Sequence, residues 1–337
     1  MRVCAIDTEL ITGDRHRVNV CESHNCMSMN FKKLVKVMKR KRLAEGLSIR
    51  ALSAKIGVSF SSLARIERGD GEPDNNSAIR ILEWLGGEGR EAGLRFDDVA
   101  YVHFRAEKNI DSKTVRHLLS AASGIKDLYQ AKDVFVDDGD EVVGLALTKL
   151  EMEEMAEEFR ADLDIGPEDA LDALRIKVDG VDVFIPADID QIDEQCLSHL
   201  VGTAASMWSA MSVPIDLEND RWAILRNDQH TVERQRVTYL EECWHIMLGH
   251  KLTKIAKITD SYGRTYDGVE EHDAFYLATA SLLPKAAVSA CVSNGEGSDA
   301  IAQKFGVSQQ LVEYRIKRLG LWKAFRGKTV TMDDPSL

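Results

Sequence analysis

Residues 238–250 read TYLEECWHIMLGH, and this stretch decides how the whole chain is interpreted. The pattern of residues 231–252 predicts one α-helix here. Because positions four apart share a face of a helix, Glu241 and His245 project together, and Glu242 lies beside them. Carboxylate and imidazole groups on one helical face are able to ligate a divalent cation. The sequence therefore raises the question of whether this helix is a metal site or an ordinary helix.

The composition is that of a globular protein with more than one domain. The chain has 337 residues, of which 44% are apolar and 29% charged, and this length allows two or three domains. No apolar run approaches the length of a membrane span, and the N-terminus lacks the apolar region of a signal peptide. Six cysteines are too sparse for a disulfide framework in a chain of this size. We therefore expect a cytoplasmic protein with reduced thiols and no membrane partner.

Charge is unevenly distributed along the chain. Residues 30–68 contain eleven lysines and arginines against two glutamates, a net charge of +9. The whole chain carries −12, so the remainder carries −21. A basic segment joined to an acidic body predicts a polyanionic partner for the first segment alone.

The basic segment contains two short helices around a glycine turn. Residues 47–69 read LSIRALSAKIGVSFSSLARIERG. Ser48 and Ser59 stand at the positions of helix N-caps, and Gly57 ends the first helix where the chain must reverse. The alternative to a DNA-binding motif is a helical bundle that happens to be basic.

This pattern resembles the Cro/C1-type (XRE) helix-turn-helix of repressors over about residues 31–86. The resemblance implies a double-stranded DNA operator as the partner and binding as a homodimer. It also implies that the second helix enters the major groove while other basic side chains contact phosphates. The groove-facing residues are then Ser59, Ser61, Ser62 and Arg65, and the phosphate-binding residues are Arg50, Lys39, Arg40 and Arg42.

The remainder of the chain divides into four parts. Residues 1–29 are predicted to be a disordered arm or leader, although Cys21, His24 and Cys26, with Cys4 or His16, are an alternative metal site. Residues 91–146 are predicted to be a helical extension and linker, helical over 104–128 and with a hinge at 137–141. Residues 147–327 form a second domain, with strands expected within 176–187 and 221–227, and residues 328–337 form a tail.

The second domain resembles the ImmA/IrrE family of zinc metallopeptidases. The resemblance covers about residues 150–325 and rests on RNDQHTVERQRVTYLEECWHIMLGH, residues 226–250, and on YDGVEEHDAFYLATASLLP, residues 266–284. Members often carry a repressor-type helix-turn-helix in front, and they cleave a partner repressor, as in prophage or stress responses. The resemblance implies a zincin-like fold, a bound Zn²⁺ and a repressor protein as substrate or partner.

The family motif assigns roles to individual residues. Glu242 matches the catalytic base and His245 the second histidine ligand. Asp273 falls where the family places a third, acidic ligand, and Glu270 and Glu271 are close alternatives. Glu241 departs from the motif, because the family has its first histidine ligand at this position.

Replacing a histidine ligand by glutamate changes the electrostatics of the expected site. Two carboxylates and one imidazole donate more negative charge to Zn²⁺, so the metal is a weaker Lewis acid and its bound water is less acidic. More oxygen ligands also shift the preference towards Mn²⁺. Three interpretations therefore remain open: a metal site with peptidase activity, a metal-free domain used for sensing or partner binding, and a chance resemblance.

The expected fold class is mainly α with a small β-sheet (α+β). It consists of an N-terminal all-α helix-turn-helix bundle, residues 30–90, and a C-terminal zincin-like metallopeptidase domain. Residues 298–322 repeat the helix, glycine turn and helix pattern, and we predict a structural helix pair there rather than a second DNA reader. The predicted function is a DNA-binding transcriptional regulator whose second domain cleaves a partner, with a non-catalytic sensor or dimerisation module as the alternative.

Overall fold

The first domain, predicted at residues 30–90, folds into five helices around its own apolar core. The computed structural model describes residues 30–94, 97–106, 110–131, 147–258, 261–265 and 267–329. The helices are α1 (Phe31–Ala44), α2 (Ile49–Ile56), α3 (Phe60–Arg68), α4 (Asn75–Leu85) and α5 (Gly87–Glu91). The predictions for residues 1–29, for the hinge at 137–141 and for the last eight residues of the tail lie outside the described residues.

The local signals of the helix-turn-helix act as the sequence predicts. The Ser48 side chain accepts a hydrogen bond from the Ala51 amide, and the Ser59 side chain accepts one from the Ser62 amide. Gly57 ends α2 with φ 66°, a left-handed conformation that glycine adopts at little cost. Leucines and isoleucines from α1 to α4 fill the core between these helices.

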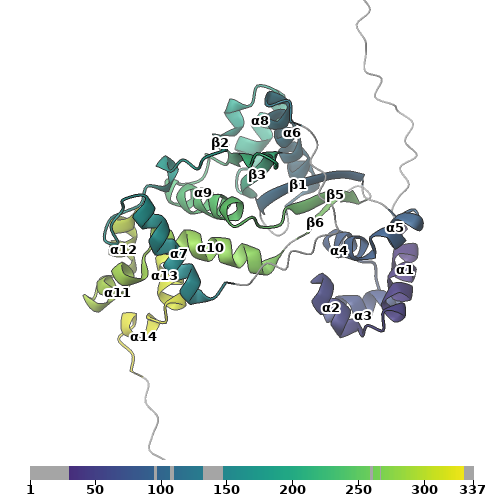
Figure 1. The fold of residues 1–337 in the computed structure, drawn as a ribbon, viewed down its shortest axis with the longest axis horizontal. Helices are drawn as coiled ribbons and strands as arrows, with labels where there is room; N and C mark the ends of the chain where they lie inside the picture. The colour runs from purple at the N-terminus through teal and green to yellow at the C-terminus, as the bar shows by residue number, and fades with distance from the viewer. Residues whose placement is uncertain are drawn as a thin grey trace, which may run out of the picture.

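A six-stranded sheet forms the centre of the second domain (Figure 1). Its strands are β1 (Asp97–Ala106), β2 (Val181–Phe184), β3 (Trp208–Asp216), β4 (Arg221–Arg226), β5 (Thr253–Ile258) and β6 (Ser261–Arg264). The strand order is β2-β4-β3-β1-β5-β6, and only the pairing of β2 with β4 is parallel.

Strand β1 corrects the prediction of a purely helical segment after the first domain. Residues 97–106 form a central strand, and only α6 (Ser112–Leu128) confirms the helix expected over 104–128. The strand pairs with β3 on one side and β5 on the other. It was missed because Val102, His103 and Phe104 are all buried, so that the apolar and polar alternation of a half-exposed strand is absent.

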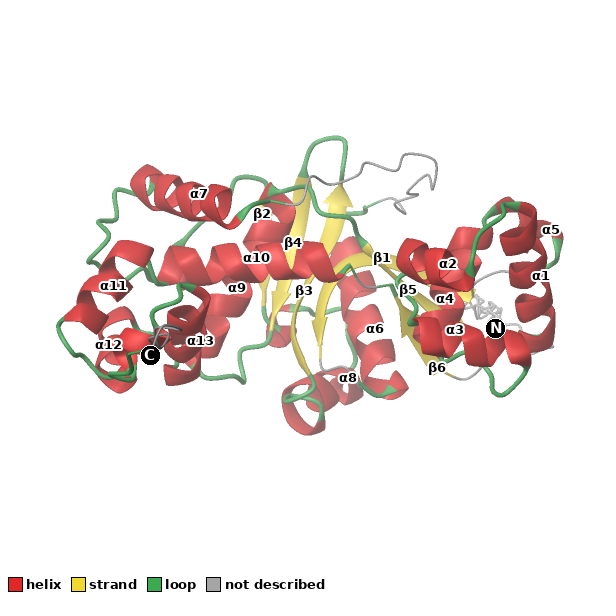
Figure 2. Cartoon of the chain, turned by 90° about the horizontal axis from the view of Figure 1, so that it is seen from below, coloured by secondary structure: helices red, strands yellow, loops and turns green. Residues whose placement is uncertain are grey.

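Helices cover both faces of the sheet (Figure 2). On one face lie α9 (Val232–Met247), α10 (Gly268–Leu282) and α7 (Lys149–Asp162), and on the other lie α6 and α8 (Glu194–Ser198). The C-terminal part adds α11 (Lys285–Ser293), α12 (Ser298–Phe305), α13 (Gln309–Arg318) and α14 (Trp322–Phe325). Short helical turns lie at Ala173–Arg175, Pro186–Asp188 and His199–Thr203.

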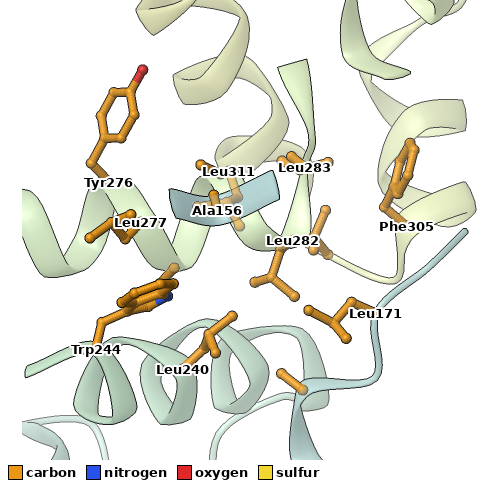
Figure 3. Packing of buried hydrophobic residues seen from close by; sticks show 14 of the residues in the cluster. Ala156, Leu171, Leu240, Trp244, Tyr276, Leu277, Leu282, Leu283, Phe305 and Leu311 are labelled. Atoms are coloured by element: carbon orange, nitrogen blue, oxygen red, sulfur yellow. The ribbon is translucent and has the colours of Figure 1, made fainter. Parts of the chain in front are cut away.

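The main apolar core lies between α9, α10 and the C-terminal helices. Figure 3 shows Leu240 and Trp244 of α9 near Leu277 and Leu282 of α10. Phe305 of α12 is fully buried in the same cluster, which also contains residues of α13. The helix pair of the C-terminal segment is therefore part of this core, in agreement with its predicted structural role.

No single helix in the described parts of the chain is long and apolar enough to cross a membrane. Helices α10 and α11 pass that test only when taken together, and they are bent by 59°.

The first domain packs against the sheet edge formed by β5 and β6. The Arg264 amide donates to the Asn76 side chain at 2.8 Å, and Lys254 Nζ lies 3.5 Å from Glu83 Oε1. Ala256 of β5 is a member of the apolar core of the first domain. A side chain at Gly263 would place its Cβ 2.6 Å from the Asn75 carbonyl oxygen, so the close approach of α4 requires glycine there.

A buried ion pair connects α7, α10 and α13. Arg315 has no exposed surface and donates to both Glu153 oxygens, at 2.7 and 2.6 Å. The Tyr276 hydroxyl donates to Glu153 at 2.6 Å, and Arg315 Nε donates to the Leu283 carbonyl at 2.9 Å. Both charges are therefore fully satisfied by partners from three helices.

We expect Arg315→Met to lower the free energy of unfolding by about 3–5 kcal/mol, because it leaves the Glu153 carboxylate buried without a cation. Urea unfolding followed by circular dichroism measures this loss. The double variant Glu153→Gln/Arg315→Met should lose less than the single variant, since no charge remains. Lys317→Met, on the exposed side of the same helix, is the control. A loss no larger than that of the control would contradict the role of the pair.

Candidate functional site

Helix α9 places the three motif residues beneath the surface. Glu241 and Glu242 are each 1% exposed, and His245 is 5% exposed. The helix lies between the sheet and α10, so its polar residues face other parts of the protein rather than solvent (Figure 2). Charged groups in such a position need partners, because removing them from water is costly.

The expected ligand atoms of a metal site partly come together. Ligand atoms of Glu241, His245 and Glu271 all lie within 4.8 Å of one another. Of the three acidic residues considered for the third ligand, Glu271 is thus the one in this cluster. Asp273 is buried on the same helix, with Oδ1 at 3.1 Å from His272 Nδ1, and Glu270 accepts a hydrogen bond from the Lys251 amide at 3.1 Å.

The Glu242 side chain is buried and hydrogen-bonded. The Ser212 hydroxyl of β3 donates to Glu242 Oε2 at 2.5 Å. Burial raises the pKa of Glu242 to about 7, and the hydrogen bond from Ser212 opposes this shift. A large fraction of this carboxyl group is therefore protonated at neutral pH.

Three histidines form a neutral group around the motif. His245 Nδ1 lies 2.9 Å from Nδ1 of His250, which follows the end of α9 at Met247 by three residues. The His103 ring of β1 stacks on His245 at 5.0 Å between centroids. Burial lowers the pKa of His245 to about 2 and that of His103 to about 3. Both imidazoles are therefore uncharged at neutral pH.

A positive charge reaches the cluster from β1. Arg105 forms an ion pair with Glu241, its guanidinium carbon lies 4.9 Å from the centre of the Phe275 ring, and its side chain is 35% exposed. Burial raises the pKa of Glu271, whereas the charge of Arg105 lowers it. The guanidinium therefore acts on the same carboxylates that would ligate a metal.

The fit of these residues to a metal ion depends on Arg105. Two carboxylates and one imidazole are suitable ligands for Zn²⁺ or Mn²⁺. However, the Glu241 carboxylate is already paired with a guanidinium, and a metal ion bound to it would lie beside another positive charge. With Arg105 in this position the three residues do not fit a metal ion.

Sequence analysis missed Arg105, His103 and Ser212. His103 and Arg105 alternate along β1 and share the face towards α9, and Ser212 pairs with His103 in the adjacent strand. The missing step was the assignment of residues 97–106 to a strand. Within YVHFR, residues 101–105, the two-residue spacing of His103 and Arg105 is the only available signal.

The predicted DNA-binding residues fall into exposed and structural groups. Ser61 and Arg65 of α3 are exposed, as are Arg50, Lys39 and Arg40. Ser62 is half-buried, and Ser59 serves as the N-cap of α3. Arg50 lies against the Phe60 ring at 5.3 Å, and Arg40 pairs with Glu88 at 3.2 Å.

Arg42 is the exception among the predicted phosphate contacts. It is 8% exposed, donates to both oxygens of Glu67 at 2.5 and 2.8 Å, and donates to the Leu47 carbonyl at 2.7 Å. Its guanidinium is therefore committed within the domain, and its role is structural rather than phosphate binding.

We expect Glu242→Gln to stabilise the protein more at pH 8 than at pH 5. The pKa of Glu242 is raised from 4.5 when unfolded to about 7 when folded, so this group destabilises the folded state as pH rises through that range. The difference between the two pH values should be about 2.5 kcal/mol. Urea unfolding measures it, with the exposed Glu154→Gln as the control. Equal effects of Glu242→Gln at both pH values would contradict the raised pKa.

Comparison with known families finds two matching regions of the chain. Residues 38–90 match the helix-turn-helix family, and residues 203–317 match the peptidase M78 family, described as the IrrE N-terminal-like domain. No curated protein and no solved structure gives a significant match. The chain therefore joins an XRE-type helix-turn-helix domain to an IrrE-like domain of the peptidase M78 family.

Proposed function

We propose that this protein is a DNA-binding transcriptional regulator whose IrrE-like domain acts without hydrolysis, as a sensor or partner-binding module. The observation that carries the proposal is the state of Glu242, the residue that matches the catalytic base. This carboxyl group is 1% exposed, and it accepts a hydrogen bond from the Ser212 hydroxyl of the neighbouring strand.

A general base must contact the water that it deprotonates, next to the bond that is cleaved. The Glu242 carboxyl group is buried. The other two motif residues, Glu241 and His245, are buried beside it. A peptide backbone would have to enter the protein interior to reach these groups. Burial of the whole motif therefore favours a non-catalytic role.

The substitution at position 241 supports the same conclusion. A histidine there would be a neutral metal ligand, whereas Glu241 carries a negative charge that Arg105 neutralises. The acidic residue thus forms an internal ion pair between α9 and β1. Such a pair holds the helix to the sheet and requires no metal.

The DNA-binding part of the proposal rests on the exposed basic face of the first domain. Arg65 and Ser61 lie on the exposed side of α3, the helix that would enter the major groove. Arg50 and Lys39 are exposed on neighbouring helices, where they are available to phosphates. Binding as a homodimer is part of this proposal and would appear as a two-fold symmetric target sequence.

A second candidate is a metal-dependent peptidase that cleaves a repressor. One observation favours it, namely the convergence of Glu241, His245 and Glu271. These residues would hold Zn²⁺ or Mn²⁺ only if the Arg105 guanidinium left Glu241, and the metal would then supply a Lewis acid. Measuring the metal content of the purified protein tests this candidate, because a stoichiometric metal that is lost in His245→Ala would support it.

We expect Arg65→Ala to weaken DNA binding roughly tenfold, or about 1.4 kcal/mol, because it removes a cationic contact in the groove. Fluorescence anisotropy measures this on duplexes selected from a random pool by the wild-type protein. Lys285→Ala, on the exposed side of α11 at the opposite end of the molecule, is the control (Figure 2). Unchanged binding by Arg65→Ala would show that α3 does not read the groove.

We expect Glu242→Gln to preserve regulation, because glutamine is able to accept the same hydrogen bond from Ser212 and lacks only the charge. A reporter controlled by the selected operator measures regulation in cells, and anisotropy confirms that both proteins bind DNA equally. If Glu242→Gln binds DNA normally but no longer regulates the reporter, the non-catalytic proposal is wrong and the peptidase candidate gains support.

A further inference from the structure

Arg105 lies near the C-terminal end of β1, and its side chain is on the face of the sheet that α9 covers. It pairs with Ala210 of β3, and the register shifts between Arg105 and Ala106. Strand alternation places it on the same face as His103, which stacks on His245. The strand thus delivers a long cationic side chain directly to the acidic residues of α9 and α10.

The guanidinium is held on more than one side. It forms an ion pair with Glu241 of α9, and it lies over the Phe275 ring of α10 at 4.9 Å. A planar cation that both pairs with a carboxylate and stacks on an aromatic ring matches the chemistry of arginine.

The cluster needs a cation for its charge to be balanced. Ligand atoms of Glu241, His245 and Glu271 lie within 4.8 Å of one another, and the Arg105 guanidinium pairs with Glu241. Two buried carboxylates this close repel each other unless a positive charge lies between them or one of them takes up a proton. A divalent metal ion and the guanidinium are alternative solutions, because two cations at one carboxylate would repel each other.

We propose that the Arg105 guanidinium is the resident cation of the Glu241, His245 and Glu271 cluster, and that a divalent metal ion binds there only by displacing it. This inference deepens the proposed function and rests on it, since a domain that keeps arginine as its cation has no Lewis acid for hydrolysis. It also accounts for Glu241, because a carboxylate pairs with a guanidinium whereas a histidine ligand does not.

The test is the metal affinity of Arg105→Gln compared with the wild type. Isothermal titration with ZnCl₂, and separately with MnCl₂, is carried out on the metal-free full-length proteins. We expect Arg105→Gln to bind at least tenfold more tightly than the wild type, with one metal per chain. The double variant Arg105→Gln/His245→Ala should lose this gain, which assigns the binding to the cluster. Equal affinities of the wild type and Arg105→Gln would overturn the inference.

Thermal unfolding provides a second readout on the same proteins. Arg105→Gln should unfold at a lower temperature than the wild type without metal, and ZnCl₂ should raise its Tm more than that of the wild type. Arg221→Gln removes another arginine from an ion pair, with Asp182 at 3.4 Å, and should show no gain in metal affinity. An equal gain in this control would overturn the assignment to Arg105.

Arg105→Lys covers the case in which Arg105→Gln does not fold. Lysine keeps the charge but lacks the planar fork, so its metal affinity should lie above that of the wild type. If Arg105→Gln does not fold and Arg105→Lys binds metal no more tightly than the wild type, the inference is overturned. Tight metal binding by the wild type would overturn the inference but leave the proposed function standing, provided that Glu242→Gln still regulates the reporter.

Discussion

The pairing of β1 with both β3 and β5 is the constraint on which the arrangement of this protein depends. The strand follows directly after the DNA-binding domain, yet it lies at the centre of the sheet of the other domain. Its one face, with Val102 and Phe104, fills the core beneath α6, and its other face presents His103 and Arg105 to α9. The same ten residues therefore join the domains, complete the sheet and supply the cation of the buried cluster.

Glu241 stands on α9 where the peptidase motif has a histidine, and its carboxylate requires a positively charged partner. With Glu241 on α9, the buried charge of the motif becomes more negative, and the fold supplies Arg105 from a different element. In our proposal this guanidinium takes the place of a metal ion at the acidic cluster.

Local chemistry made part of this structure predictable from the sequence. Helix caps at Ser48 and Ser59, together with the glycine turn, are signals that act within a few residues, and the helix-turn-helix followed from them. The grouping of Glu241 with His245 followed from helical spacing in the same way. The contributions of Arg105 and Glu271 did not, because they depend on strand pairing and on how α10 packs against α9. The burial of Arg42 was equally hidden, since its partner Glu67 is distant in sequence.

The contact between α4 and the β5–β6 hairpin limits how freely these domains recombine. Ala256 belongs to the hydrophobic core of the first domain although it lies on the sheet of the second, and Gly263 allows the backbone of α4 to approach. A helix-turn-helix domain cut out at its sequence boundary would leave an apolar face without its cover. A chimaera that carries a different DNA-binding domain would therefore need matching residues on the β5–β6 hairpin.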